Sequence, residues 1–202
     1  MRHDRTSYMN TLTLEEMLPR LGKRQAAFEI MLAHIGACQY PLIVETGVSR
    51  QENNFDGDGM STLIWDAAAN KHQGTVQCVD INPDNCRFAK NQTSDRTMVY
   101  CGDSVKFLAY KEQEYDKLSR KIDLLYLDSY DLDINNWHPS AQHHIYELLA
   151  IKGALKPGSL VCVDDNLIIN GMHIGKGTYV AEWMAAVGKE MIYQGYQWIW
   201  RW

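Results

Sequence analysis

Acidic residues end or closely follow the apolar runs of this chain, and this pattern suggests a binding site. The acidic residues that end such runs, or closely follow them, are Glu45, Asp80, Asp103, Asp128 and the pair Asp164–Asp165. If the runs are parallel strands, their carboxyl ends meet at one edge of a sheet, where open α/β proteins bind ligands. Carboxylates gathered at one edge are costly unless they meet cations or donors. Capping of the next helix explains any one of them, since Asp is a favoured N-cap residue, but explains the whole set poorly.

The elements that must position these residues alternate along the chain. Short apolar runs that predict strands cover residues 42–45, 76–80, 98–101, 122–128 and 160–164. Segments with helical patterns cover residues 60–72, 84–92, 104–118, 141–155 and 176–188. Such alternation predicts βαβ crossovers and an α/β, Rossmann-like doubly wound sheet. Two last runs, 191–194 and 197–201, predict a C-terminal antiparallel hairpin, which makes the sheet seven-stranded and mostly parallel.

The chain length and the first residues indicate the domain organisation. At 202 residues the chain suits one α/β domain. Residues 1–40 read as an N-terminal helical cap, in which Thr13 and Glu16 have the spacing of a capping box. Residues 41–202 form the predicted α/β part.

Composition narrows the classes of partner and compartment. With 20 Lys and Arg against 25 Asp and Glu, the net charge of -5 does not favour nucleic acid. We find neither an apolar stretch long enough to span a membrane nor a signal peptide. The five cysteines form no CxxC pair, which argues against disulfides or a zinc site and predicts a cytoplasmic protein. The aromatic residues of the tail favour packing in the core or in a homo-oligomer over a platform for stacking bases.

The first two strand ends suggest a nucleoside-containing cofactor. Glu45-Thr46-Gly47 ends a strand in glycine, which allows a tight turn and close approach of the backbone to a ligand. Asp80 ends the next strand, where a carboxylate can accept hydrogen bonds from both ribose hydroxyls.

These residues also resemble a known family. Ile43-Val44-Glu45-Thr46-Gly47, Cys78-Val79-Asp80, Gly102-Asp103-Ser104 and Leu125-Tyr126-Leu127-Asp128 are similar to the strand-end motifs of class I S-adenosylmethionine-dependent methyltransferases. The resemblance implies that Glu45, Thr46 and Gly47 lie at the methionine part of the cofactor and that Asp80 holds the ribose. It places Asp103 and Ser104 at the adenine, and Ser49, Ile81 and Asp128 complete the implied cofactor site. The usual second and third glycines are replaced by Val48-Ser49-Arg50 and a polar insertion that runs to Gly59.

A narrower resemblance concerns a metal ion. Asp128 and the Asp164-Asp165-Asn166 segment are similar to the magnesium ligands of metal-dependent small-molecule O-methyltransferases of the macrocin and catechol type. The resemblance implies that Asp128, Asp164 and Asp165 bind Mg²⁺, an ion that prefers oxygen ligands. The alternative is that the pair caps a helix or binds loop backbone.

The predicted function is transfer of a methyl group from S-adenosylmethionine to an oxygen of a small molecule such as a sugar, polyol or phenol, with assistance from a divalent metal ion. Asp128 and Asp131 are the predicted catalytic residues, with Asp131 as general base; His143, His144 and His173 are weaker candidates. The glycine-rich segment 171–177 favours a lid over a phosphate-binding turn with Lys176. Two alternatives remain: a non-methylating, hydroxylase-like enzyme of the same fold, and a nucleoside-binding protein without catalysis.

Overall fold

The computed structural model describes residues 12–58 and 60–202, and its centre is a seven-stranded sheet. The strand order is β3-β2-β1-β4-β5-β9-β8. The first five strands run parallel, whereas β9 is antiparallel to both β5 and β8. The strands are β1 (Leu42–Thr46), β2 (Thr75–Asp80), β3 (Thr97–Cys101), β4 (Ile122–Leu127), β5 (Leu155–Val163), β8 (Glu190–Gln194) and β9 (Trp198–Arg201). The predicted α/β, Rossmann-like sheet with its C-terminal antiparallel hairpin is confirmed.

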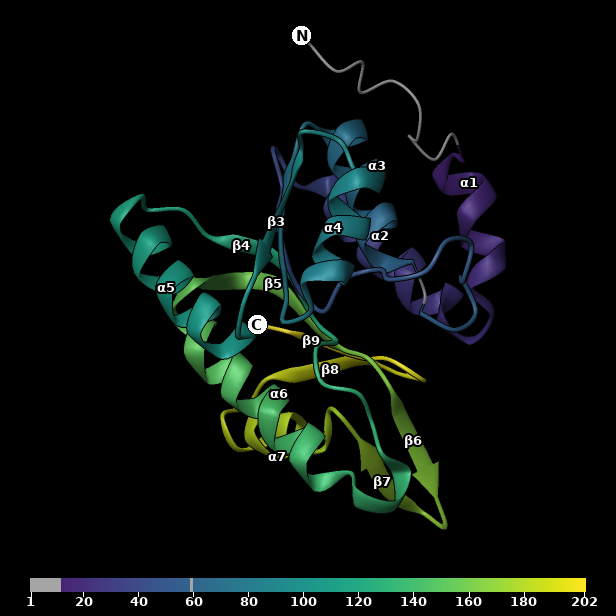
Figure 1. Ribbon diagram of the computed structural model, residues 1–202. Helices are drawn as coiled ribbons and strands as arrows, with labels where there is room; N and C mark the ends of the chain where they lie inside the picture. The colour runs from purple at the N-terminus through teal and green to yellow at the C-terminus, as the bar shows by residue number, and fades with distance from the viewer. Residues whose placement is uncertain (1–11, 59) are drawn as a thin grey trace, which may run out of the picture.

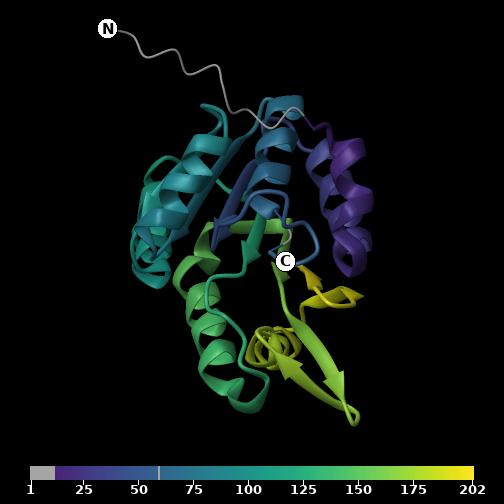
Figure 2. The same cartoon turned by 45° about the vertical axis from the view of Figure 1, so that its right-hand side comes forward.

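Helices cover both faces of the sheet (Figures 1 and 2). One face carries α2 (Gln25–Ala37), α3 (Ser61–His72) and α4 (Pro83–Gln92), and the other carries α5 (Ser104–Lys117), α6 (His138–Ile151) and α7 (Thr178–Ala186). Each face has its own buried apolar core. On the first face, the rings of Phe28 and Trp65 stack with their centroids 4.8 Å apart. This burial holds the strand ends in fixed positions.

The N-terminal segment is helical, as the sequence predicts. Helix α1 (Leu14–Met17) begins at a complete capping box of Thr13 and Glu16. A 3₁₀ segment, η1 (Leu18–Arg24), then leads into α2. Of the predicted cap over residues 1–40, residues 1–11 lie outside the described part of the chain.

The segment after β5 differs from the sequence-based expectation. A second, two-stranded sheet forms there from β6 (Asn166–Ile169) and β7 (Met172–Gly175). Asn170 and Gly171 have φ values of 52° and 77°, which suit the two-residue turn of a hairpin. The hairpin projects from the body of the molecule (Figures 1 and 2).

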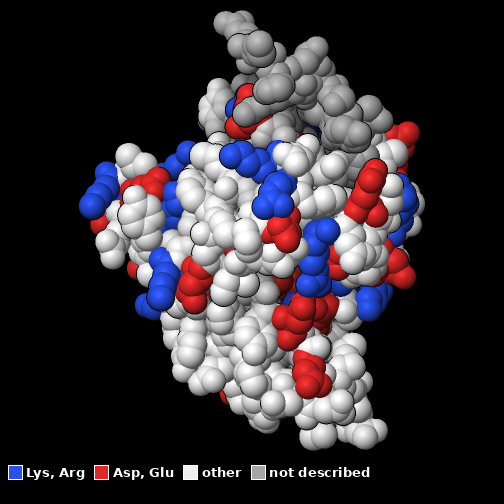
Figure 3. Space-filling view, viewed as in Figure 1, with Lys and Arg blue, Asp and Glu red and all other residues white. Residues whose placement is uncertain are grey.

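Charged side chains are unevenly distributed on the face that Figure 3 shows. Basic and acidic groups alternate over the upper part, whereas the region over β6, β7 and the start of α6 carries few charges. In the described residues we find no helix that is long and apolar enough to cross a membrane.

Candidate functional site

A polar cavity of about 220 Å³ lies at the carboxyl ends of the strands, where the strand order reverses between β1 and β4. Five residues that the sequence predicts for the site line it: Gly47, Asp80, Asp128, Asp131 and Asp165. The other lining residues are Arg24, Val48, Arg50, Gly57, Asp58, Ser61, Ser129, Lys176 and Tyr196.

Gly47 turns the chain out of β1 and into the cavity wall. Its φ is +76°, and its N–H donates to the carbonyl of Val79 at 2.9 Å. A Cβ at this position would lie 2.3 Å from the carbonyl oxygen of Asp128. The close approach of two strand ends therefore requires glycine here.

Asp80 ends β2 beside this turn. Its carboxylate accepts hydrogen bonds from the backbone N–H groups of Val48 at 3.3 Å and Asn82 at 2.7 Å. The Asn85 amide also donates to it, at 3.3 Å. These donors fix the Asp80 carboxylate at the cavity wall. The next residue, Ile81, which the sequence also predicts for the cofactor site, is 75% exposed.

Other residues of the predicted cofactor set are placed differently. Thr46 and Ser49 are buried, and the hydroxyl of Thr46 donates to Glu147 at 3.1 Å rather than facing the cavity. Ser104 is also buried, and its hydroxyl lies 2.9 Å from Nε2 of His143. Asp103 is the N-cap of α5 and accepts the N–H of Lys106 at 2.9 Å.

The histidines lie outside the cavity lining. Nε2 of His143 lies 3.3 Å from the buried Glu147 carboxylate, which raises the pKa of His143. Burial lowers the pKa of His144 to about 4. His173 sits on β7 and lies 3.3 Å from the Gln194 amide. The positions of the three histidines give none of them contact with the cavity.

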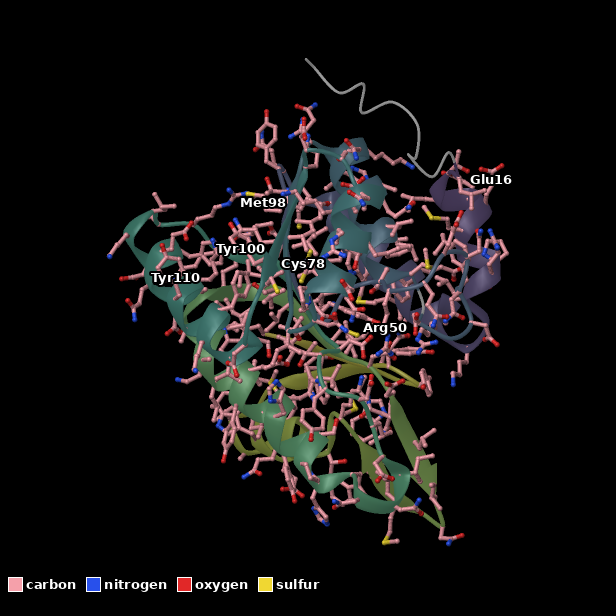
Figure 4. All side chains as sticks on the ribbon, viewed as in Figure 1. Glu16, Arg50, Cys78, Met98, Tyr100 and Tyr110 are labelled. Atoms are coloured by element: carbon pink, nitrogen blue, oxygen red, sulfur yellow. The ribbon has the colours of Figure 1, made fainter. Side chains whose placement is uncertain are left out.

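Asp131, the predicted general base, lies at the mouth of the cavity. Its two carboxylate oxygens each accept a hydrogen bond from the Arg50 guanidinium at 3.2 Å. Arg50 also pairs with Asp58 at 3.4 Å. Figure 4 shows Arg50 between the upper helices and the β6–β7 hairpin. The insertion after β1 thus reaches the segment after β4 through this arginine.

Two buried cations, absent from the predicted site, meet the carboxylates after β4 and β5. Lys176 Nζ contacts Oδ1 of Asp128 and lies 2.8 Å from Oδ2 of Asp165. Arg24 Nε donates to Oδ2 of Asp164 at 3.0 Å. Both cations are almost completely buried, at 1% and 4% exposure.

The charges in this cluster support one another only in part: burial and the carboxylates of Asp164 and Asp165 raise the pKa of Asp128 well above its usual range, although Lys176 opposes the rise. Burial alone would raise the pKa of Asp165, but Lys176, together with Tyr196 and Arg24, holds it at about 2. Burial would likewise lower the pKa of Lys176, but the neighbouring carboxylates raise it instead. Lys176 is therefore an ammonium group at neutral pH.

Glu45 stands near the end of β1, two residues before Gly47, and is completely buried. Among the described residues, neither carboxylate oxygen has a hydrogen-bond partner. Burial raises the pKa of the Glu45 carboxyl to about 8. Glu45 is therefore mostly protonated in the folded chain at neutral pH.

This gives an expected pH dependence of stability. In the unfolded chain Glu45 ionises near its ordinary pKa of 4.5, whereas in the folded chain it keeps its proton up to about pH 8. Between these two pH values the folded state therefore binds one proton more than the unfolded state. The folded chain loses stability as the pH rises through this window. We expect Glu45→Gln to gain about 2 kcal/mol relative to the parent chain between roughly pH 5 and 7. Urea denaturation at both pH values measures the difference, with the exposed Glu190→Gln as control. A pH-independent difference for Glu45→Gln would contradict the assignment.

Comparison with known proteins agrees with this fold. No protein-family model matches the chain, and no curated protein matches it. Among solved structures, it is similar to the MycE methyltransferase from the mycinamycin biosynthetic pathway in complex with Mg and SAH, with a TM-score of 0.63 and 13% identity over 94% of this chain and 54% of that one. It is also similar to NSun6 from Pyrococcus horikoshii with SFG, with a TM-score of 0.53 and 14% identity over 83% of this chain and 42% of that one.

The chain thus spans about half the length of these two structures. At this identity the similarity shows the fold alone, which is the Rossmann-like fold found in methyltransferases.

Proposed function

We propose that this protein transfers a methyl group from S-adenosylmethionine to an oxygen of a small molecule. One observation carries the proposal: the Gly47 turn, the Asp80 carboxylate and the carboxylates after β4 and β5 line one cavity at the strand reversal. Ligands of doubly wound sheets bind at such a reversal. The two similar structures were determined with SAH and with SFG, which supports the same proposal.

The chain offers groups that fit this cofactor. Asp80 would hold the ribose hydroxyls, since its carboxylate is fixed by backbone donors at the cavity wall. Glu45, Thr46 and Ser49 would support the methionine part from beneath, and Ile81, Asp103 and Ser104 would lie toward the adenine. S-adenosylmethionine supplies a methyl group that bonds to the acceptor oxygen as its bond to sulfur breaks, which leaves S-adenosylhomocysteine.

The acceptor hydroxyl must also lose its proton. Asp131 is our candidate to accept that proton, because its carboxylate lies at the cavity mouth. Its two contacts with Arg50 would hold the carboxylate in place. A base within reach of the acceptor contributes to the rate at neutral pH.

The magnesium site implied by the resemblance does not fit the arrangement of these side chains. Asp128 and Asp165 already share Lys176, and Asp164 is paired with Arg24. In the described part of the chain we find no group of three or more His, Cys, Asp or Glu side chains arranged to hold a metal ion. A bound divalent cation would have to displace an ammonium group or repel it. The proposed reaction is therefore not routed through magnesium.

A calorimetric titration with S-adenosylhomocysteine tests the cofactor site. We expect micromolar binding by the parent chain and affinity at least about tenfold weaker in Asp80→Ala, because hydrogen bonds to a charged group contribute about 1.5–3 kcal/mol. Asp80→Asn, which keeps the side-chain size and removes the charge, is the second variant. Asp84→Ala, in the exposed first turn of α4, is the matched control and is expected to bind normally. Absence of binding by the parent chain would refute the proposal.

The second candidate is a nucleoside-binding protein without catalysis. It is favoured by the internal pairing of the acidic cluster, which gives Asp128, Asp164 and Asp165 a structural role. Methyl transfer to a panel of sugars, polyols and phenols separates the two candidates. Cofactor binding with no transfer to any of them would favour the second.

A further inference from the structure

We propose that the ammonium group of Lys176 takes the place that the sequence suggests for a magnesium ion, so that the acceptor site works without a metal. The identification of the cavity as an acceptor site rests on the proposed function. The placement of Lys176 between Asp128 and Asp165 is independent of the proposed function.

Lys176 is buried at the wall of the cavity. Its side chain is 1% exposed, yet it lines the cavity together with Asp128 and Asp165. These two carboxylates come from the ends of neighbouring strands, β4 and β5, and both contact Nζ. The lysine thus bridges two of the three residues of the predicted magnesium site.

Asp164 and Asp165 have further partners in the cluster. Asp164, the third predicted ligand, is held by Arg24 Nε at 3.0 Å and accepts the Tyr126 hydroxyl at 2.7 Å. Tyr196 donates its hydroxyl to Asp165. Every carboxylate of the predicted metal site therefore already has a cation or a donor, and a divalent ion would have to displace Lys176 to reach Asp128 and Asp165.

The backbone around Lys176 fixes it in place. The β6–β7 hairpin returns the chain to the end of β5, and Lys176 N–H donates to the Asp165 carbonyl at 3.3 Å. On one side, Gly175 has a φ of +154°, and a Cβ there would lie 2.4 Å from that same carbonyl oxygen. On the other, Gly177 N–H donates to the Asn166 side chain at 2.8 Å. The lysine therefore stands between two anchored glycines at the start of α7.

The proposal restricts the acceptor. An ammonium group has three N–H donors, and within the described residues Nζ contacts only Asp128 and Asp165, which leaves one N–H for an oxygen in the cavity. This donor and its charge would stabilise a single developing alkoxide or phenolate oxygen. A vicinal diol, which chelates a metal through two oxygens, gains no advantage at such a site.

Binding of Mn²⁺, followed by electron paramagnetic resonance of the free ion, tests the proposal without any turnover. We expect the parent chain to leave the free Mn²⁺ signal unchanged. Lys176→Met removes the charge at similar length and should take up one Mn²⁺ per chain with at least about tenfold higher affinity. The melting temperature of this variant should rise when Mg²⁺ is added. Lys156→Met is the control, since Lys156 pairs with Asp123 outside the cavity lining and its loss should create no Mn²⁺ site.

Two results would overturn the proposal. One is that the parent chain binds one Mn²⁺ and that Asp128→Asn abolishes this binding. This result does not depend on whether the Lys176 variant folds. The other is that Lys176→Met folds but has no higher affinity for Mn²⁺ than the parent chain. The S-adenosylhomocysteine titration reports separately on the proposed function: failed cofactor binding with the expected Mn²⁺ pattern would refute methyl transfer and leave the lysine assignment intact.

Discussion

Replacement of Gly47 by alanine is expected to lower the free energy of unfolding by about 3 kcal/mol or more and to abolish binding of S-adenosylhomocysteine. A left-handed backbone costs an L-residue roughly 1–2 kcal/mol. The added Cβ would also lie 2.3 Å from the Asp128 carbonyl oxygen, which cannot retreat easily because Asp128 N–H donates to Thr46 at 2.9 Å. Urea denaturation and a calorimetric titration measure the two effects.

Gly171→Ala is the matched control for this experiment. Gly171 has nearly the same φ, +77°, but nothing lies within 4 Å of a Cβ built there. We expect it to cost only the backbone term, about 1 kcal/mol, and to leave cofactor affinity unchanged. Equal losses in both variants would mean that the contact between the ends of β1 and β4 is not what requires glycine at position 47.

The sheet could be predicted because each parallel strand is a short apolar run that stands between helical patterns. Leu42–Thr46 and Ile122–Leu127 are buried on every residue, as strands covered on both faces must be. The β6–β7 hairpin was missed, although Asn170-Gly171 between two alternating apolar segments is the usual signal for a two-residue turn. The glycine-rich composition of segment 171–177 drew attention to a lid instead.

The strand-end carboxylates could be predicted, but their partners could not. Arg24 lies 140 residues from Asp164 in sequence, and Lys176 lies 48 residues from Asp128. Arg24 belongs to no local motif and reaches Asp164 through tertiary packing alone, whereas Lys176 stands in the glycine-rich segment 171–177 and the β6–β7 hairpin returns it to the carboxylates. Neighbouring carboxylates need a cation or a hydrogen-bond donor between them. The structure meets that need with two side chains of the chain itself.

Three residues predicted to bind the cofactor make other contacts in the structure. Asp103 caps a helix, whereas Thr46 and Ser104 contact residues far away in the sequence. Asp103 follows the capping rule that the sequence offered as an alternative. Thr46 and Ser104 turn inward because the buried carboxylate of Glu147 and the His143 ring beside it need hydrogen-bonding partners. Their predicted contacts with a cofactor stay predictions, and Glu147 could not be singled out from a helical pattern.

The ion pair between Arg24 and Asp164 is expected to be the other large contributor to stability. Both side chains are buried, at 4% and 1% exposure, so removal of Arg24 leaves Asp164 with only the Tyr126 hydroxyl, and removal of Asp164 leaves Arg24 with the longer contact to Asp165 at 3.4 Å. We expect Arg24→Met to cost about 3–5 kcal/mol. The guanidinium also donates to the Asp56 carbonyl at 2.9 Å, so the loss should loosen the insertion after β1 as well. Urea denaturation measures the free energy of unfolding, and amide hydrogen exchange measures how far the insertion after β1 loosens.

A double-mutant cycle distinguishes this pair from general damage to the core. Arg24→Met combined with Asp164→Asn should lose less than the sum of the two single losses, with a coupling energy of about 2 kcal/mol, because the double variant buries no unpaired charge. The exposed pair of Arg87 and Asp84 is the control, and Arg87→Met should change stability very little. Additive losses would mean that Arg24 acts by packing alone. In that case Lys176 alone, and not Arg24 of the N-terminal segment, would stabilise the ionised carboxylates of the acidic cluster.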